Sequence, residues 1–200
     1  MTPAKKLILA SASPRRRELL TQLGASYDCD PADIDETPLP GELPADYVQR
    51  MAECKAACVA GRHPLSEYSV LAADTTVVVD GDVLGKPADR FDGLAMLARL
   101  SGRMHTVMTS VCLHSAEGVV TQLVATEVQF IQLGRDVCEA YLTTDEPWDK
   151  AGAYGIQGLG GAFVNAIHGS YSNVVGLPLT ETWQLLSANG IATRLENGGE

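Results

Sequence analysis

The segment from Leu7 to Arg17 constrains the fold of this 200-residue chain more than any other. It begins with a short apolar run typical of a buried strand, which leads through Ser11 and Ser13 to Pro14 and three arginines. Serine is a good helix cap and proline is tolerated in the first helical turn, so the segment predicts a strand that ends where a helix begins. A helix N-terminus favours an anion, and arginines placed there oppose the helix dipole. We therefore expect something negative, a phosphate above all, to bind at this turn.

Charge and composition exclude several classes of protein. The formal net charge of −10 argues against non-specific binding to nucleic acid or anionic lipid, so a polyanion would need a local cationic pocket or a metal ion. The sequence has no apolar run of roughly 18 residues, and the run at 7–10 after Lys5 and Lys6 is short for the core of a signal peptide, so we expect neither a membrane span nor a signal peptide. The five cysteines are scattered, and no second Cys or His pair stands at zinc-site spacing from Cys54 and Cys58. We therefore expect free thiols, as in a cytoplasmic protein.

Hydrophobic periodicity predicts alternating strands and helices. Strands are expected at residues 7–10, 69–79, 83–84, 104–114, 119–133 and 162–167, and helices at 14–23, 45–60, 89–100, 137–142 and 179–188. Turns at 80–81 and 116–118 indicate antiparallel pairs, and a polar, proline-rich loop covers 30–44. No linker divides the chain, so we expect one mixed α/β domain over 1–195 around a curved sheet, with a frayed tail at 196–200.

Asp74 stands within the apolar, β-branched strand predicted at 69–79. A carboxylate is costly there unless it is paired or binds a cation. One interpretation is a structural aspartate bonded to backbone N–H groups or to an arginine. The other is a functional aspartate that binds a divalent metal, acts as general base on a water, or does both.

Other candidate side chains are individually weaker. Lys86 follows a glycine in a loop, where it is either solvated or reaches a ligand. Lys55 lies near the apolar face of the helix at 45–60, where it either snorkels to solvent or reaches a ligand. Glu36 belongs to the acidic loop, where charges are usually solvated. The glycine-rich segment 150–161 is neither a Walker loop nor a dinucleotide fingerprint, but Tyr154 and Gln157 there offer groups to hydrogen-bond or stack on a base.

Taken together, the motifs resemble those of the Maf family of nucleotide pyrophosphatases over about residues 7–188. They are Ala10-Ser11-Ala12-Ser13-Pro14-Arg15-Arg16, Ile34-Asp35-Glu36, Lys55-Ala56, Ala73-Asp74-Thr75, Leu84-Gly85-Lys86-Pro87, Leu100-Ser101-Gly102 and the run from Lys150 to Gly158. The resemblance implies hydrolysis of a nucleoside triphosphate to a monophosphate and pyrophosphate, aided by Mg²⁺ or Mn²⁺. It also implies a single elongated α/β domain with a mixed sheet and two lobes around a central cleft, similar to the inosine triphosphate pyrophosphatases.

The resemblance assigns roles to individual positions. It implies that the phosphates are bound by Ser11, Ser13, Arg15 and Arg16, and that the metal is held by Glu36 and Asp74. It implies catalytic roles for Asp74, Lys55 and Lys86. It also implies that Gln157, with Tyr154 nearby, contacts the substrate. Asp74 is the expected base.

The segment from Ala151 to Gly158 looks like that of members acting on dTTP and UTP. Two alternatives stay open. The same chemistry could act on another base, such as that of 7-methyl-GTP or a modified pyrimidine. The protein could instead be a nucleotide-binding regulator of cell division with little turnover. Members of the family often form homodimers, so the resemblance allows a homodimer.

Overall fold

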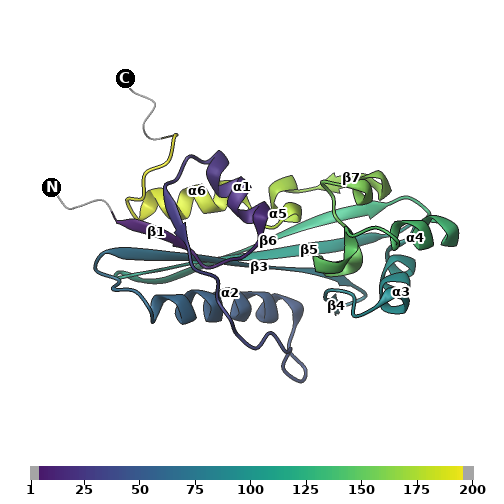
Figure 1. Cartoon of the computed structure of the whole chain (residues 1–200), viewed down its shortest axis with the longest axis horizontal. Coiled ribbons are helices and arrows are strands. Elements are labelled where there is room, and N and C mark those ends of the chain that lie inside the picture. The colour runs from purple at the N-terminus through teal and green to yellow at the C-terminus, as the bar shows by residue number, and fades with distance from the viewer. Residues whose placement is uncertain (1–4, 196–200) are drawn as a thin grey trace. The chain divides into compact units, whose positions relative to one another are not determined.

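The structure, a computed structural model, describes residues 5–195 (Figure 1). The predicted frayed tail at 196–200 lies outside the described residues. The strands are β1 (Lys6–Leu9), β2 (Tyr27–Cys29), β3 (Tyr68–Val79), β4 (Asp82–Leu84), β5 (Met104–Ser115), β6 (Gly118–Phe130) and β7 (Val164–His168). The helices are α1 (Pro14–Gln22), α2 (Pro44–Ala60), α3 (Arg90–Leu100), α4 (Arg135–Tyr141), α5 (Tyr171–Val175) and α6 (Leu179–Ala188), with short 3-10 turns η1 (Pro147–Asp149), η2 (Ala151–Ala153) and η3 (Leu159–Phe163).

These strands form one mixed sheet in the order β2-β1-β3-β5-β6-β7, with β4 paired to β3. β1 runs parallel to both β2 and β3, whereas β4 is antiparallel to β3 and β7 is antiparallel to β6. Residues 116–117 alone join β5 to its neighbour β6, a connection short enough only for antiparallel strands. The predicted mixed α/β fold is thus confirmed.

Most predicted elements appear within one or two residues of their expected ends, and the differences are local. β2 was not predicted, β6 ends at Phe130 rather than at residue 133, and the glycine-rich segment contains η2 and part of η3. The five cysteines are free thiols, as predicted. Within residues 5–195, no helix combines the length and the hydropathy needed to cross a lipid bilayer.

The described chain forms two compact units. Unit 1 comprises residues 5–74, 109–124 and 176–195, and unit 2 comprises residues 75–108 and 125–175. β3, β5 and β6 contribute residues to both units.

In unit 1, α2 packs on one face of the sheet, and α1 and α6 lie on the other (Figure 1). The apolar residues of α2 recur at helical spacing and form a single buried stripe. That stripe meets side chains of β1, β3 and β5 in one cluster, which contains Ile8, Ala10, Ala52, Ala56, Val59, Ala60, Val70, Ala72 and Cys112.

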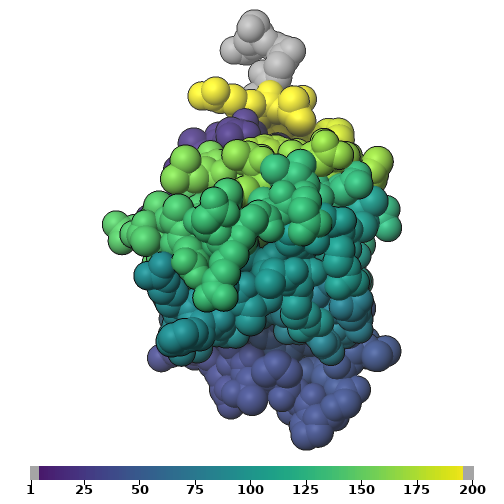
Figure 2. All heavy atoms as spheres, turned by 90° about the vertical axis from the view of Figure 1, so that its right-hand side faces the viewer, coloured from purple at the N-terminus to yellow at the C-terminus, as the bar shows by residue number. Residues whose placement is uncertain are grey.

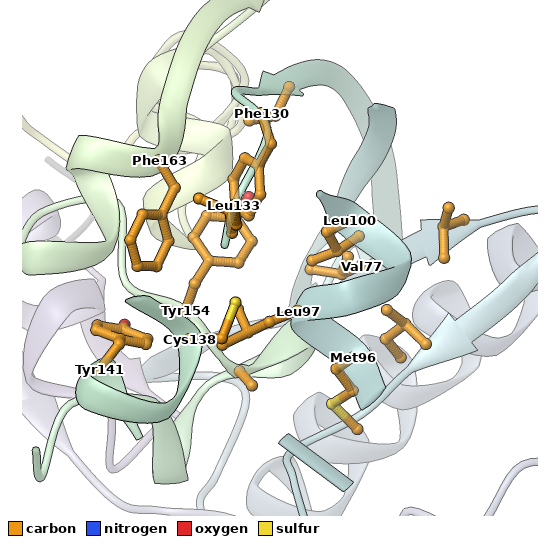
Figure 3. Close-up of a cluster of buried hydrophobic side chains, with 14 of the residues drawn as sticks. Val77, Met96, Leu97, Leu100, Phe130, Leu133, Cys138, Tyr141, Tyr154 and Phe163 are labelled. Atoms are coloured by element: carbon orange, nitrogen blue, oxygen red, sulfur yellow. The ribbon is translucent and has the colours of Figure 1, made fainter. Parts of the chain in front are cut away.

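Unit 2 has a separate core that is rich in aromatic rings (Figure 3). Phe130 contacts Tyr154 edge-on with ring centroids 4.7 Å apart, and Tyr141 contacts Phe163 in the same way at 4.9 Å. One face of α3 supplies Leu97 to this core. α3 and α4 both reach the face of unit 2 that is turned toward the viewer in Figure 2.

Candidate functional site

The turn between β1 and α1 has the predicted geometry. Ser13 is the N-cap of α1 and its Oγ accepts the N–H of Arg16 at 3.4 Å, while Pro14 stands in the first helical turn. The Ser13 N–H donates in turn to Ser11 Oγ at 3.2 Å. Buried β1 therefore leads directly into a capped helix whose first turn carries Arg15 and Arg16.

Arg16 is held within unit 1 rather than extended into solvent. Its Nε donates to the Gly176 carbonyl oxygen at 2.8 Å, and its Nη1 donates to Ser11 Oγ at 3.4 Å. Burial lowers the pKa of the Arg16 guanidinium, whereas the negative charges of Asp74 and Glu36 raise it. The arginine therefore shares one electrostatic environment with both predicted carboxylates.

Those two carboxylates converge on Lys55. Lys55 Nζ lies 2.6 Å from Glu36 Oε1 and 2.7 Å from Asp74 Oδ1. The side chains of Lys55 and Asp74 are only 12% and 11% exposed, whereas that of Glu36 is 48% exposed. This ion pair compensates the burial of Asp74 within β3, and it brings together residues from α2, β3 and the loop between β2 and α2.

The pair of carboxylates fits a divalent cation that is shared with phosphate oxygens. Mg²⁺ is usually bound through one or two protein carboxylates plus substrate phosphates, and Glu36 and Asp74 supply two such hard oxygen donors. Over residues 5–195, no three or more His, Cys, Asp or Glu side chains group together as metal ligands.

Unit 2 holds the other three predicted site residues. Lys86 is exposed between β4 and α3, and Gln157 is exposed within the glycine-rich segment. Tyr154, in contrast, is 5% exposed, and its hydroxyl lies 2.8 Å from Nε2 of His105. Its ring packs edge-on with Phe130 in the aromatic core (Figure 3), so it is buried rather than presented on the surface.

Comparison with known proteins identifies the family. The family model described as "Maf-like protein" matches residues 6–189. The chain belongs to the Maf family.

Similar proteins include a "dTTP/UTP pyrophosphatase" of Anaeromyxobacter dehalogenans, 56% identical over 94% of this chain and 95% of that protein. Proteins with the same name from Shewanella oneidensis and Methylobacillus flagellatus are 53% and 51% identical, over 92% and 94% of this chain and 98% and 94% of their own lengths. Among solved structures, the Staphylococcus aureus Ham1 protein gives a TM-score of 0.43 at 13% identity, covering 63% of this chain and 72% of that one.

The Maf motifs are thus distributed over both units. Unit 1 brings together Ser11, Arg16, Glu36, Lys55 and Asp74 through the contacts described above. The Lys86 turn and the glycine-rich segment are joined within unit 2, because the Gly152 N–H donates to the Gly85 carbonyl oxygen at 3.0 Å.

Glu146, which sequence analysis missed, organises the glycine-rich segment. Its Oε1 accepts the Tyr141 hydroxyl at 2.8 Å and the Gly160 N–H at 2.9 Å, and its Oε2 accepts the Leu159 N–H at 2.8 Å. A Cβ on Gly158 would stand 2.2 Å from Glu146 Oε2. Glycine lets the backbone close on this carboxylate without moving it, and the glycine density of the segment was the available signal.

Proposed function

We propose that the protein hydrolyses dTTP and UTP to the corresponding monophosphate and pyrophosphate with the help of Mg²⁺ or Mn²⁺. The observation that carries the proposal is the convergence of Glu36 and Asp74 on Lys55, in the electrostatic environment of Arg16. Its preference for dTTP and UTP is supported by the names of Maf relatives that are more than half identical to this chain.

The triphosphate would be bound by cations and N–H groups at the start of α1. Because the chain carries a net charge of −10, the negative charge of a triphosphate has to be offset locally. Arg15 and Arg16 stand in the first turn of α1, where backbone N–H groups also point outward. An arginine fork suits bidentate contacts with phosphate oxygens, so this turn would orient the phosphate chain.

Asp74 would act as the general base. It would take a proton from the water that attacks between the α- and β-phosphates. Before the metal binds, Lys55 holds the Asp74 carboxylate in place. When bound, a divalent cation held by Glu36 and Asp74 would offset charge on the phosphate oxygens. The roles of Lys86 and Gln157 stay predictions from the family motifs.

Purified protein with Mg²⁺ and a panel of nucleoside triphosphates tests the proposal, with monophosphate and pyrophosphate release as readouts. We expect selective turnover of dTTP and UTP, and a loss of about a hundredfold or more in kcat for Asp74→Asn. Asp30→Asn is the matched control, because Asp30 is also an ion-paired aspartate of unit 1 but contacts Arg62 and His63. A near-normal kcat for Asp74→Asn would remove Asp74 from the role of base.

The same panel separates the alternatives. Turnover confined to 7-methyl-GTP or to modified pyrimidines would keep the chemistry and change the base. Tight binding with no turnover would favour a nucleotide-binding regulator of cell division instead. We propose further that the enzyme acts in the cytoplasm as one catalytic domain, and that sedimentation of the purified protein will decide between monomer and homodimer.

A further inference from the structure

Glu36 lies in a stretch without helix or strand, between Cys29 at the end of β2 and Pro44 at the start of α2. A carboxylate on such a loop can serve a site only if the loop backbone is held. Two side chains of α2 hold it at two consecutive peptide groups. The Tyr47 hydroxyl donates to the Glu36 carbonyl oxygen at 3.0 Å, and Arg50 Nη2 donates to the Thr37 carbonyl oxygen at 3.2 Å.

Arg50 also binds the far end of the loop through Glu42. Its Nε donates to Glu42 Oε1 at 2.5 Å and its Nη2 donates to Oε2 at 2.7 Å, a bidentate pair. Glu42 Oε2 further accepts the Leu39 N–H at 2.9 Å, which closes the turn. The Glu42 side chain is 7% exposed, and hydrogen bonding from Arg50 lowers its pKa to about 2, so the pair stays charged over the whole range in which an enzyme works.

Tyr47 is a dependable donor in this arrangement. Burial, together with the negative charges of Asp74 and Glu36, raises the pKa of its hydroxyl to about 12, so the proton is retained. The Arg50 guanidinium carbon lies 5.7 Å from the centroid of the Tyr47 ring, within the range of a cation–π contact. The two side chains thus support one another as well as the loop.

The same helix carries Lys55, which binds the Glu36 carboxylate at 2.6 Å. α2 therefore holds Glu36 by its carbonyl oxygen through Tyr47 and by its carboxylate through Lys55, while Arg50 holds the next carbonyl oxygen of the loop. We propose that Tyr47 and Arg50 are positioning residues, which set the Glu36 carboxylate opposite Asp74 for the metal–nucleotide complex. This inference rests on the proposed function.

A positioning role and a purely structural role predict different measurements. Outer contacts that orient a metal ligand typically change metal affinity or activity by 10–100-fold when they are removed. Loss of a structural contact lowers thermal stability and the folded fraction, but it leaves the metal dependence of the folded molecules unchanged.

The test compares Tyr47→Phe and Arg50→Lys with Arg62→Lys. Arg62 is a matched control, because it binds the Asp30 carboxylate at 2.7 Å and the Pro31 carbonyl oxygen at 3.2 Å at the opposite end of the same loop. Mn²⁺ binding is titrated by electron paramagnetic resonance in the presence of a non-hydrolysable α,β-methylene analogue of dTTP, and dTTP turnover is measured across a Mn²⁺ series.

We expect about tenfold weaker Mn²⁺ binding for Tyr47→Phe and Arg50→Lys, with kcat restored to within about twofold at saturating Mn²⁺ and no change for Arg62→Lys. Mn²⁺ binding within about twofold of wild type for both variants would overturn the inference, as would an equal loss in the Arg62→Lys control. Because the titration does not require turnover, absence of dTTP hydrolysis by the wild-type protein would refute the proposed function without deciding the positioning role.

Discussion

Replacing Lys55 with methionine isolates the electrostatic role of the ammonium at the centre of the site. Methionine retains most of the apolar stem but removes the charge that Glu36 and Asp74 share. If the ammonium stands where a divalent cation would otherwise lie, the variant should lose stability in metal-free buffer and regain it when Mn²⁺ is added.

The distances set the size of the effect. Because Glu36 Oε1 and Asp74 Oδ1 lie 2.6 and 2.7 Å from the same nitrogen, these two oxygens are at most 5.3 Å apart. Two unit charges at that distance repel by roughly 3 kcal/mol at an effective dielectric constant of 20. Since the Glu36 side chain is 48% exposed, solvent screening reduces the expected loss of unfolding free energy to about 1–2 kcal/mol.

Mn²⁺ should offset that loss. Binding to the folded state alone adds about 1.4 kcal/mol to the unfolding free energy when Mn²⁺ is at ten times its Kd. The wild-type protein should gain less at the same concentration, because the metal has to displace the ammonium first.

Urea denaturation with and without Mn²⁺ measures both the loss of unfolding free energy in Lys55→Met and the gain that Mn²⁺ gives. Lys5→Met is the control, because Lys5 pairs with both oxygens of one carboxylate, that of Glu117, whereas Lys55 joins the carboxylates of two residues. An equal gain from Mn²⁺ in wild type and in Lys55→Met would refute the idea that the ammonium occupies the cation position.

Two further predictions concern unit 2. Gly152 has φ 71°, and a Cβ there would lie 3.1 Å from the Val77 methyl carbons, whereas Gly190 has φ 68° with open space around it. Both alanine variants adopt the same unfavourable backbone region, so Gly152→Ala should lose about 1–3 kcal/mol more unfolding free energy than Gly190→Ala in urea titrations, and equal losses would contradict the close approach. Burial lowers the pKa of His105 to about 4, below its ordinary value of 6.5. Between pH 6.5 and pH 4 the unfolded chain therefore binds a proton at this histidine that the folded chain does not. The unfolding free energy should fall by roughly 3 kcal/mol as the pH drops over this range. His105→Gln should lack this component of the pH dependence.

Local chemistry explains which parts of the fold were predictable. Ser13 and Pro14 define a helix start by their own conformational preferences, and the structure has α1 starting at Pro14. Asp80 and Gly81 adopt φ 54° and 83°, as a two-residue hairpin turn requires. β2 could not be predicted, because its three residues are partly or fully exposed and show no periodicity; only pairing with β1 makes them a strand.

The sequence indicated which residue types form the candidate site, but not which of them contact one another. The sequence contains Glu36, Lys55 and Asp74 as separate charges, and only the register of α2 against β3 places one ammonium between two carboxylates. For Tyr154, the sequence does not show which way the side chain points. An aromatic side chain in a glycine-rich segment has suitable chemistry for a base, but its direction is set by the aromatic core, and the ring turns inward.

The close packing of α2 explains how a buried aspartate can be tolerated within β3. Ala52 and Ala56 are fully buried against the sheet, and such small side chains let a helix axis approach closely. Lys55 stands directly before Ala56 in the same helix, and its ammonium lies 2.7 Å from Asp74 Oδ1. Bulkier side chains on the stripe would lift α2 from the sheet and lengthen this contact. The alanines that make α2 pack well are therefore also what lets its lysine neutralise Asp74, so the core of unit 1 and the chemistry of its site depend on the same residues.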